Sequence, residues 1–172
     1  MIEPDKVKVE AEKLEEENYK FRRFLKGRAD SDKLDAQFLE LHNELFDSYD
    51  CSKCANCCKE CGTTLAGDEV AMIAAFLGLP LDRFVAEYLA EVDEDGEMPY
   101  VFKEKPCPFL DDEGHCRIEG CQPEVCVGFP YTDQPDRMSS LLSIIDHAGI
   151  CPVVFEILER LKKMYGFRGQ RR

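Results

Sequence analysis

Five of the ten cysteines in this chain lie within eleven residues, and this run limits the possible folds more than any other feature. The run is CSKCANCCKEC, and its cysteines are Cys51, Cys54, Cys57, Cys58 and Cys61. A C-x-x-C step lets one turn direct two sulfur atoms at one metal, and a repeated step adds a third ligand. Since zinc takes four sulfur or nitrogen ligands and iron–sulfur clusters take four thiolates, the run predicts a metal-binding body.

Length and charge exclude several other classes of protein. The 172 residues suit one domain with an appendage and are too few for a (β/α)₈ barrel. The formal net charge of −13 repels phosphate backbones, so we expect no nucleic-acid partner. No segment resembles a signal peptide, and the longest near-apolar run, 71–81, is too short for a membrane helix. We therefore expect a cytoplasmic protein without membrane contact, whose reduced thiols serve as metal ligands.

The other cysteines are spread along the second half of the chain. They are Cys107, Cys116, Cys121, Cys126 and Cys151. Cys107 and Cys116 bracket a predicted hairpin, so their sulfur atoms are expected to converge at its open end. Cys151 precedes Pro152, a favoured first residue of a helix, which places its sulfur where the helix dipole stabilises a thiolate. Ten cysteines could complete two four-thiolate sites with two left over.

The first cysteine run fits more than one kind of site. Cys51, Cys54, Cys57 and Cys61 follow the C-x2-C-x2-C-x3-C spacing of bacterial ferredoxins. Cys54, Cys58 and Cys61 have the spacing of a radical S-adenosylmethionine triad, which so dense a run can match by chance. Adjacent Cys57 and Cys58 are expected to point in different directions and to serve two metals, or to leave one thiol as a spectator. For Cys61 and Cys121, ligation and simple burial stay equally open.

The three histidines are weaker ligand candidates than the cysteines. They are His42, His115 and His147. We expect them to be structural or to support a ligand cysteine.

Outside the cysteines, the pattern predicts a mostly α fold of the α+β class. Residues 1–50 contain no cysteine and carry two apolar stripes, which predict a helical hairpin packed on the core rather than a coiled-coil arm. The stripes are Val7, Ala11, Leu14, Asn18, Phe21 and Leu25, then Leu34, Phe38, Leu41 and Leu45. Ser31 is the expected N-cap of the second helix.

The cysteine-rich body is predicted to combine helices with a short β-hairpin. Helices are expected over 67–77, ending at Gly78, and over 81–89. Tyr100–Phe102 is typical of a strand, and the DDEG turn at 111–114 favours a hairpin.

The end of the chain gives mixed signals. Residues 138–145 fit either a strand or a helix, and a final amphipathic helix is expected to start at Pro152. From Arg160 onward the chain has six basic residues and no acid, so we expect a frayed terminus whose cations suit a helix C-terminus. The predicted domains are a helical hairpin extension at 1–50, a cysteine-cluster metal-binding domain at 51–166 and a basic tail at 167–172.

Four motifs follow one another along the second part of the chain. They are CxxCxxCC at 51–58, CPFLDDEGHC at 107–116, PEVCVGFP at 123–130 and CP at 151–152. Their order and spacing resemble the YkgJ-like cysteine-cluster family, which is described as a candidate zinc- or iron-chelating domain. The resemblance implies eight metal ligands, which are Cys51, Cys54, Cys57, Cys58, Cys107, Cys116, Cys126 and Cys151. The family is also similar to the cysteine-rich part of flagellin lysine N-methylase.

Three functions remain open at this point. The leading expectation is a cytoplasmic protein whose thiolates hold one or two iron–sulfur clusters, for redox or accessory work with an unidentified protein partner. The first alternative is a structural zinc-binding interaction module, since zinc accepts four thiolates equally well. The second is a protein-modifying enzyme related to flagellin lysine N-methylase, which needs a cleft beside the metal with groups such as Asp146 and His147. No residue is identified as catalytic.

Overall fold

The computed structural model describes residues 1–92 and 96–168. In this part the chain is mostly α-helical with a small antiparallel sheet, as the sequence predicts. It divides into two compact units: unit 1 is Met1–Asp50 with Pro130–Arg172, and unit 2 is Cys51–Phe129. The predicted domains 1–50, 51–166 and 167–172 stay a prediction, because these units describe packing only. Residues 169–172 of the predicted basic tail lie outside the described residues.

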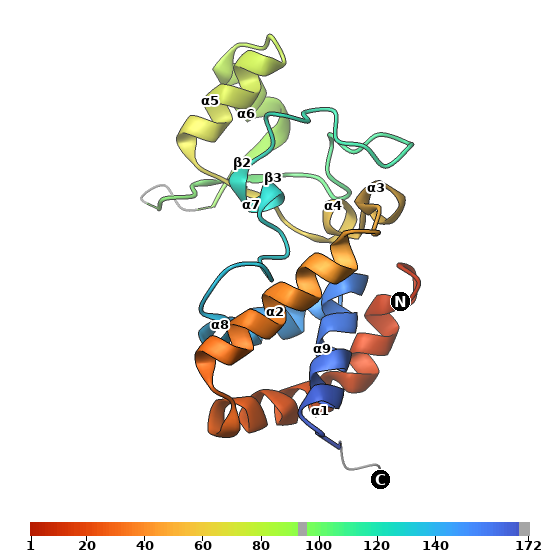
Figure 1. The fold of residues 1–172 in the computed structure, drawn as a ribbon. Helices are drawn as coiled ribbons and strands as arrows, with labels where there is room; N and C mark the ends of the chain where they lie inside the picture. Colours follow the sequence, from red (N-terminus) through yellow and green to blue (C-terminus); the bar gives the residue numbers. More distant parts are fainter. Residues whose placement is uncertain (93–95, 169–172) are drawn as a thin grey trace. The chain divides into compact units, whose positions relative to one another are not determined.

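Unit 1 is a helical assembly. Its helices are α1 (Val7–Arg28), α2 (Ser31–Phe46), α8 (Arg137–Ala148) and α9 (Pro152–Met164). The predicted apolar stripes form the buried faces of α1 and α2, with Leu14 partly buried, and both helices pack on α8 and α9 (Figure 1). The N-cap of α2 is Asp30 rather than Ser31, because the Asp30 carboxylate accepts the N–H of Lys33 at 2.9 Å.

The last two helices decide between the structures that the sequence left open at the end of the chain. The ambiguous stretch 138–145 lies in α8, and α9 begins at Pro152 as predicted. The expectation of a frayed end from Arg160 is wrong for residues 160–164, because α9 continues to Met164, whereas the expected cations at a helix C-terminus are present as Lys162 and Lys163 in its last turn. Lys162 is buried and donates to Glu17 at 2.9 Å, while Arg160 pairs with carboxylates of α2 and of its own helix. Hydrogen-bonded ion pairs of this kind allow charged side chains to be buried.

Unit 2 is built from shorter elements. They are α3 (Cys51–Cys54), α4 (Asn56–Glu60), β1 (Thr64–Leu65), α5 (Gly67–Phe76), α6 (Leu81–Tyr88), β2 (Leu89–Glu91), β3 (Tyr100–Phe102) and α7 (Glu124–Val127). The strands form an antiparallel sheet in the order β1-β3-β2. Both predicted helices and the predicted strand are confirmed. Gly78 follows α5 with a φ of +66°, the left-handed turn that ends many helices.

The core of unit 2 joins the α5–α6 pair to the sheet and the cysteine hairpin. Its buried residues are Leu65, Val70, Ile73, Ala74, Phe84, Leu89, Phe102, Phe109, Ile118 and Cys121. Cys107 and Cys116 are partly buried against this cluster. The thiols therefore stand at the edge of an apolar core, which fixes the backbone that carries them.

No described helix is both long and apolar enough to cross a membrane.

Candidate metal centre

The first cysteine run folds into two very short helices separated by one left-handed residue. Ala55 lies between α3 and α4 with a φ of +50°, and its N–H donates to the Cys51 carbonyl at 2.8 Å. This turn lets the chain present cysteines from both helices within ten residues. Cys54 is buried and Cys51 is exposed, so the run reaches from the interior of unit 2 to its surface.

Cys57 and Cys58 do not point apart. Their sulfur atoms lie 4.0 Å from each other, so the expectation of different directions is wrong. Neighbouring side chains of a helical turn diverge at the backbone, but rotation about the Cα–Cβ bond can bring their ends together. The contact with Cys57, followed by burial, raises the pKa of the Cys58 thiol. Both sulfurs can therefore reach one metal or one polynuclear cluster.

The segment 107–118 forms the predicted hairpin beside this run. Leu110 and Cys116 form a β-bridge, and the Arg117 N–H donates to the Phe109 carbonyl at 2.8 Å. The N–H of Cys107 donates to the Cys58 carbonyl at 2.7 Å. That bond joins the hairpin directly to the residue at the end of the CxxCxxCC motif.

Backbone N–H groups donate to each of the two hairpin sulfurs. The N–H groups of Phe109 and Leu110 act on the Cys107 sulfur, and the N–H of Ile118 acts on the Cys116 sulfur. Burial is the larger effect and raises the pKa of both thiols, whereas these hydrogen bonds lower it. Donors of this kind stabilise a thiolate once a metal replaces its proton.

Four thiols from three separate segments of unit 2 interact electrostatically with one another. We define the four-thiol set as Cys58, Cys107, Cys116 and Cys126. The pKa of Cys126 is raised to about 11, mainly by partial burial of its sulfur and in smaller part by the thiols of the other three residues. The Cys58 thiol likewise raises the pKa of both Cys107 and Cys116. The hydroxyl of Thr63 lies 3.6 Å from the Cys126 sulfur and favours its thiolate form.

The donor chemistry of this set fits a thiolate-bound metal. All ten cysteines lie in the described residues and are present there as thiols. Across residues 1–92 and 96–168, no three or more His, Cys, Asp or Glu side chains already stand in an arrangement that could hold a metal ion. Ligation therefore requires the sulfurs to converge further by side-chain rotation. Four soft donors with N–H and O–H groups around them are what zinc and iron–sulfur centres use.

The remaining cysteines have different surroundings. Cys61 lies near Cys58, and burial raises the pKa of its thiol. Cys121 belongs to the apolar core of unit 2, which favours the interpretation of simple burial. Cys151 is buried in unit 1 as the N-cap of α9, as predicted. The eight-residue ligand set, including Cys51, Cys54, Cys57 and Cys151, stays a prediction.

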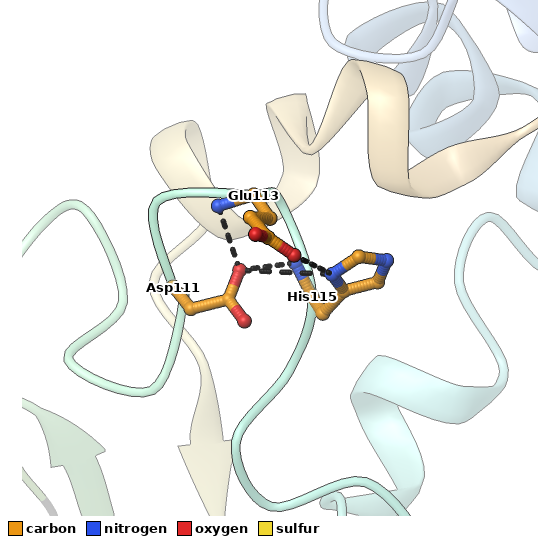
Figure 2. Close-up of polar contacts among 3 residues, drawn as sticks. All are labelled: Asp111, Glu113 and His115. Carbon is orange, nitrogen blue, oxygen red and sulfur yellow. Dashed lines mark hydrogen bonds and ion pairs between the residues drawn. The ribbon is translucent and has the colours of Figure 1, made fainter.

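His115 is held by the turn of the hairpin (Figure 2). The Asp111 carboxylate accepts the N–H groups of Glu113 at 2.9 Å and His115 at 2.8 Å. The His115 Nδ1 lies 3.8 Å from the Asp111 carboxylate and 3.9 Å from that of Glu113. The backbone N–H of His115 is the main cause that lowers the pKa of Asp111. His115 thus contacts turn carboxylates, while His42 and His147 lie in unit 1.

Sequence reasoning missed two lysines and one hydroxyl beside the thiols. Lys59 donates to the Cys54 carbonyl at 2.9 Å, and Lys105 donates to the Glu60 carbonyl at 3.1 Å. Thr63 contacts Cys126. The available signal was proximity in sequence, because Lys59 follows Cys58 and Lys105 lies two residues before Cys107.

Comparison with known proteins gives one match. A sequence model of the CxxCxxCC family, described as "Putative zinc- or iron-chelating domain", matches residues 50–152. The match starts just before the first cysteine run and ends just after Cys151. No curated protein and no solved structure matches the chain.

Proposed function

The chain belongs to the CxxCxxCC family, a zinc- or iron-chelating domain, and from this we propose that its thiolates hold an iron–sulfur cluster for redox or accessory work with a partner protein. The family match over residues 50–152 is the observation that carries the proposal, and the four-thiol set supports it. This set offers four sulfur ligands from segments around residues 58, 107–116 and 126, which is the number an iron–sulfur cluster takes. The ferredoxin spacing of Cys51, Cys54, Cys57 and Cys61 offers thiolates for a second cluster.

The surroundings of the thiols suit a redox role. Hydrogen bonds to cluster sulfurs, net charge and solvent exposure set the potential of such centres. Backbone N–H groups donate to the sulfurs of Cys107 and Cys116, and the residues Cys51 and Cys126 are exposed at the surface of unit 2. A cluster near the surface can exchange electrons with a docked protein. A reducing compartment such as the cytoplasm keeps these thiols available.

One distance favours a second candidate, a structural zinc site. Two thiolates on one tetrahedral zinc stand about 3.8 Å apart, given the ~2.3 Å zinc–sulfur bond. The sulfurs of Cys57 and Cys58 are 4.0 Å apart, close to that spacing. A zinc site would make unit 2 a metal-stabilised interaction module.

The test is metal analysis of the full chain purified without oxygen. We expect a brown protein with broad visible absorption, containing iron and acid-labile sulfide in about equal amounts. A colourless protein with stoichiometric zinc would replace the cluster with the zinc site. A chain that binds neither iron nor zinc after reconstitution would contradict both proposals.

A further inference from the structure

A metal bound by four thiolates carries negative charge that the surrounding protein has to offset. Four thiolates around Zn²⁺ leave a formal charge of about −2, and a [4Fe–4S]²⁺ cluster held by four thiolates has the same total. The chain itself has a net charge of −13, which makes this charge harder to accommodate. Nearby cations therefore matter for either metal.

Lys59 places one cation beside the first cysteine run. Its ammonium group donates to the Cys54 carbonyl at 2.9 Å, and the contact is partly buried. Cys54 ends α3 and Lys59 lies in α4, so this hydrogen bond also ties the two short helices together. Lys59 directly follows Cys58, a member of the four-thiol set, in the chain.

Lys105, which lies later in the chain, places a second cation beside the same cysteine run. Its ammonium group donates to the Glu60 carbonyl, the last residue of α4, at 3.1 Å. A Cβ on Gly62 would stand 3.5 Å from both the Cε and Nζ atoms of Lys105, an ordinary van der Waals distance, so the end of the lysine side chain packs beside Gly62. Lys105 also lies two residues before Cys107, another member of the four-thiol set.

Both ammonium groups are thus fixed by backbone carbonyls of the segment that carries the thiols. A side chain held in this way keeps its charge near the sulfurs without being a ligand. Groups that support ligands from outside the coordination sphere commonly change metal affinity about 10–100-fold when they are removed.

We propose that Lys59 and Lys105 are positioning residues that offset the negative charge of the metal–thiolate centre and thereby set its affinity and, for a redox centre, its potential. The inference rests on the proposed function, because it requires a metal at the thiols. It holds for iron–sulfur and zinc alike.

The test uses Lys59→Met and Lys105→Met in the full chain, because methionine keeps the length of the side chain without its charge. Zinc affinity is measured by chelator competition, with Zn²⁺ as the probe. We expect each variant to bind zinc about tenfold more weakly than the wild type. Lys59→Arg and Lys105→Arg should restore most of the affinity, because they restore the charge.

Lys103→Met is the matched control, since the Lys103 ammonium donates to the Ala86 carbonyl at 2.6 Å, away from the cysteine run in sequence. It should bind zinc as the wild type does. Raising the salt concentration should narrow the difference between the wild type and the methionine variants, since ions screen exposed charges. In iron-loaded protein, both methionine variants should have a more negative midpoint potential.

Two results would overturn the inference alone. One is unchanged zinc affinity in both methionine variants. The other is an equal loss in the arginine variants that salt does not affect, because then packing rather than charge is responsible. A wild-type chain that binds neither metal overturns the proposed function, and this inference with it.

Discussion

The backbone carbonyl of Ser52 lies against Gly114, so closely that any Cβ at position 114 would overlap its oxygen. Ser52 belongs to α3 and Gly114 to the turn of the cysteine hairpin, and Gly114 has a φ of +89°. The contact joins two of the cysteine-bearing segments of unit 2. Glycine is needed here both for the close approach and for the left-handed backbone.

Gly114→Ala should therefore separate the hairpin from α3. The left-handed strain costs about 1 kcal/mol, and the overlap adds roughly 1–3 kcal/mol. Gly120→Ala is a matched control, because Gly120 has a φ of +83° but nothing within 4 Å of an added Cβ. Urea unfolding of both variants, together with zinc affinity, measures the difference. Equal losses in the two variants would mean that the Ser52 contact is unimportant.

Cys116→Ser should remove one ligand of the four-thiol set. We expect the variant to lose most of its bound metal, because serine binds zinc and iron far more weakly than a thiolate. Cys121→Ala is the control, since Cys121 belongs to the apolar core. It should keep its metal and lose about 1 kcal/mol of stability through the small cavity. Metal content per chain and thermal melting check both expectations, and metal loss in Cys121→Ala would make Cys121 a ligand.

Cys57→Ser and Cys58→Ser should differ although the residues are adjacent. Cys58 interacts with Cys107, Cys116 and Cys126, so Cys58→Ser should remove the metal bound by the four-thiol set. Cys57 lies 4.0 Å from Cys58, and its loss should leave that set complete. The number of metal ions bound per chain in each variant tests this difference between Cys57 and Cys58. An equal loss of metal would show that both sulfurs bind the same centre.

Metal binding should release protons. Burial raises the pKa of Cys107, Cys116 and Cys126, in the last case to about 11, so these thiols are protonated at neutral pH without metal. Each ligating thiolate then frees one proton, about four per ion for the complete set, and affinity rises with pH. Zinc addition to weakly buffered protein with a pH indicator measures the release. Absence of proton release would contradict thiolate ligation.

The same pKa shifts predict that the folding stability of the metal-free chain depends on pH. A thiol whose pKa is raised in the folded state contributes stability below its unfolded value, near 9, and loses it as the pH rises toward the folded value. Urea unfolding of metal-free protein between pH 8 and pH 11 should therefore show falling stability, with less change in the Cys126→Ser variant. Stability that stays constant over this range would contradict the shift.

His147 should make unit 1 sensitive to acid. Burial lowers the pKa of His147 below its usual 6.5, and its hydrogen bond to the Pro130 carbonyl only partly opposes this. A lowered pKa means full stability above the unfolded value and a loss as the pH falls through the folded value. His147→Gln should be less sensitive between pH 7 and pH 5 in urea unfolding. Identical pH profiles for the variant and the wild type would exclude His147 as the cause.

The local elements were predictable because each has a strong signal of its own. The stripes of α1 and α2 repeat every three or four residues over several turns, and packing on α8 and α9 buries them. Gly78 and Pro152 mark a helix end and a helix start through their backbone preferences. Strands β1 and β2 were missed, because two or three residues are too few to show a period.

The candidate site was predictable in its chemistry and not in its grouping. Cysteine spacing identifies possible ligands, but it does not say which distant thiols meet. The bond between Cys107 and Cys58 spans nearly fifty residues and depends on the intervening core. The direction of the Cys57 and Cys58 side chains depends on rotation about single bonds, which the sequence pattern does not contain. The contacts of Lys59 and Lys105 with backbone carbonyls were hidden for the same reason.

Because unit 2 is inserted between two halves of unit 1, the stability of the unit 1 helices depends on the folding of the unit that carries the thiols. Residues 51–129 leave unit 1 after Asp50 and return at Pro130. While this insert is folded, its two ends are held at a fixed separation. If metal loss unfolds this insert, packing of α1 and α2 on α8 and α9 must close an unfolded loop of roughly 80 residues, which raises the entropic cost of folding unit 1. A chelator acting on the cysteines of unit 2 would thus also loosen the helices of unit 1.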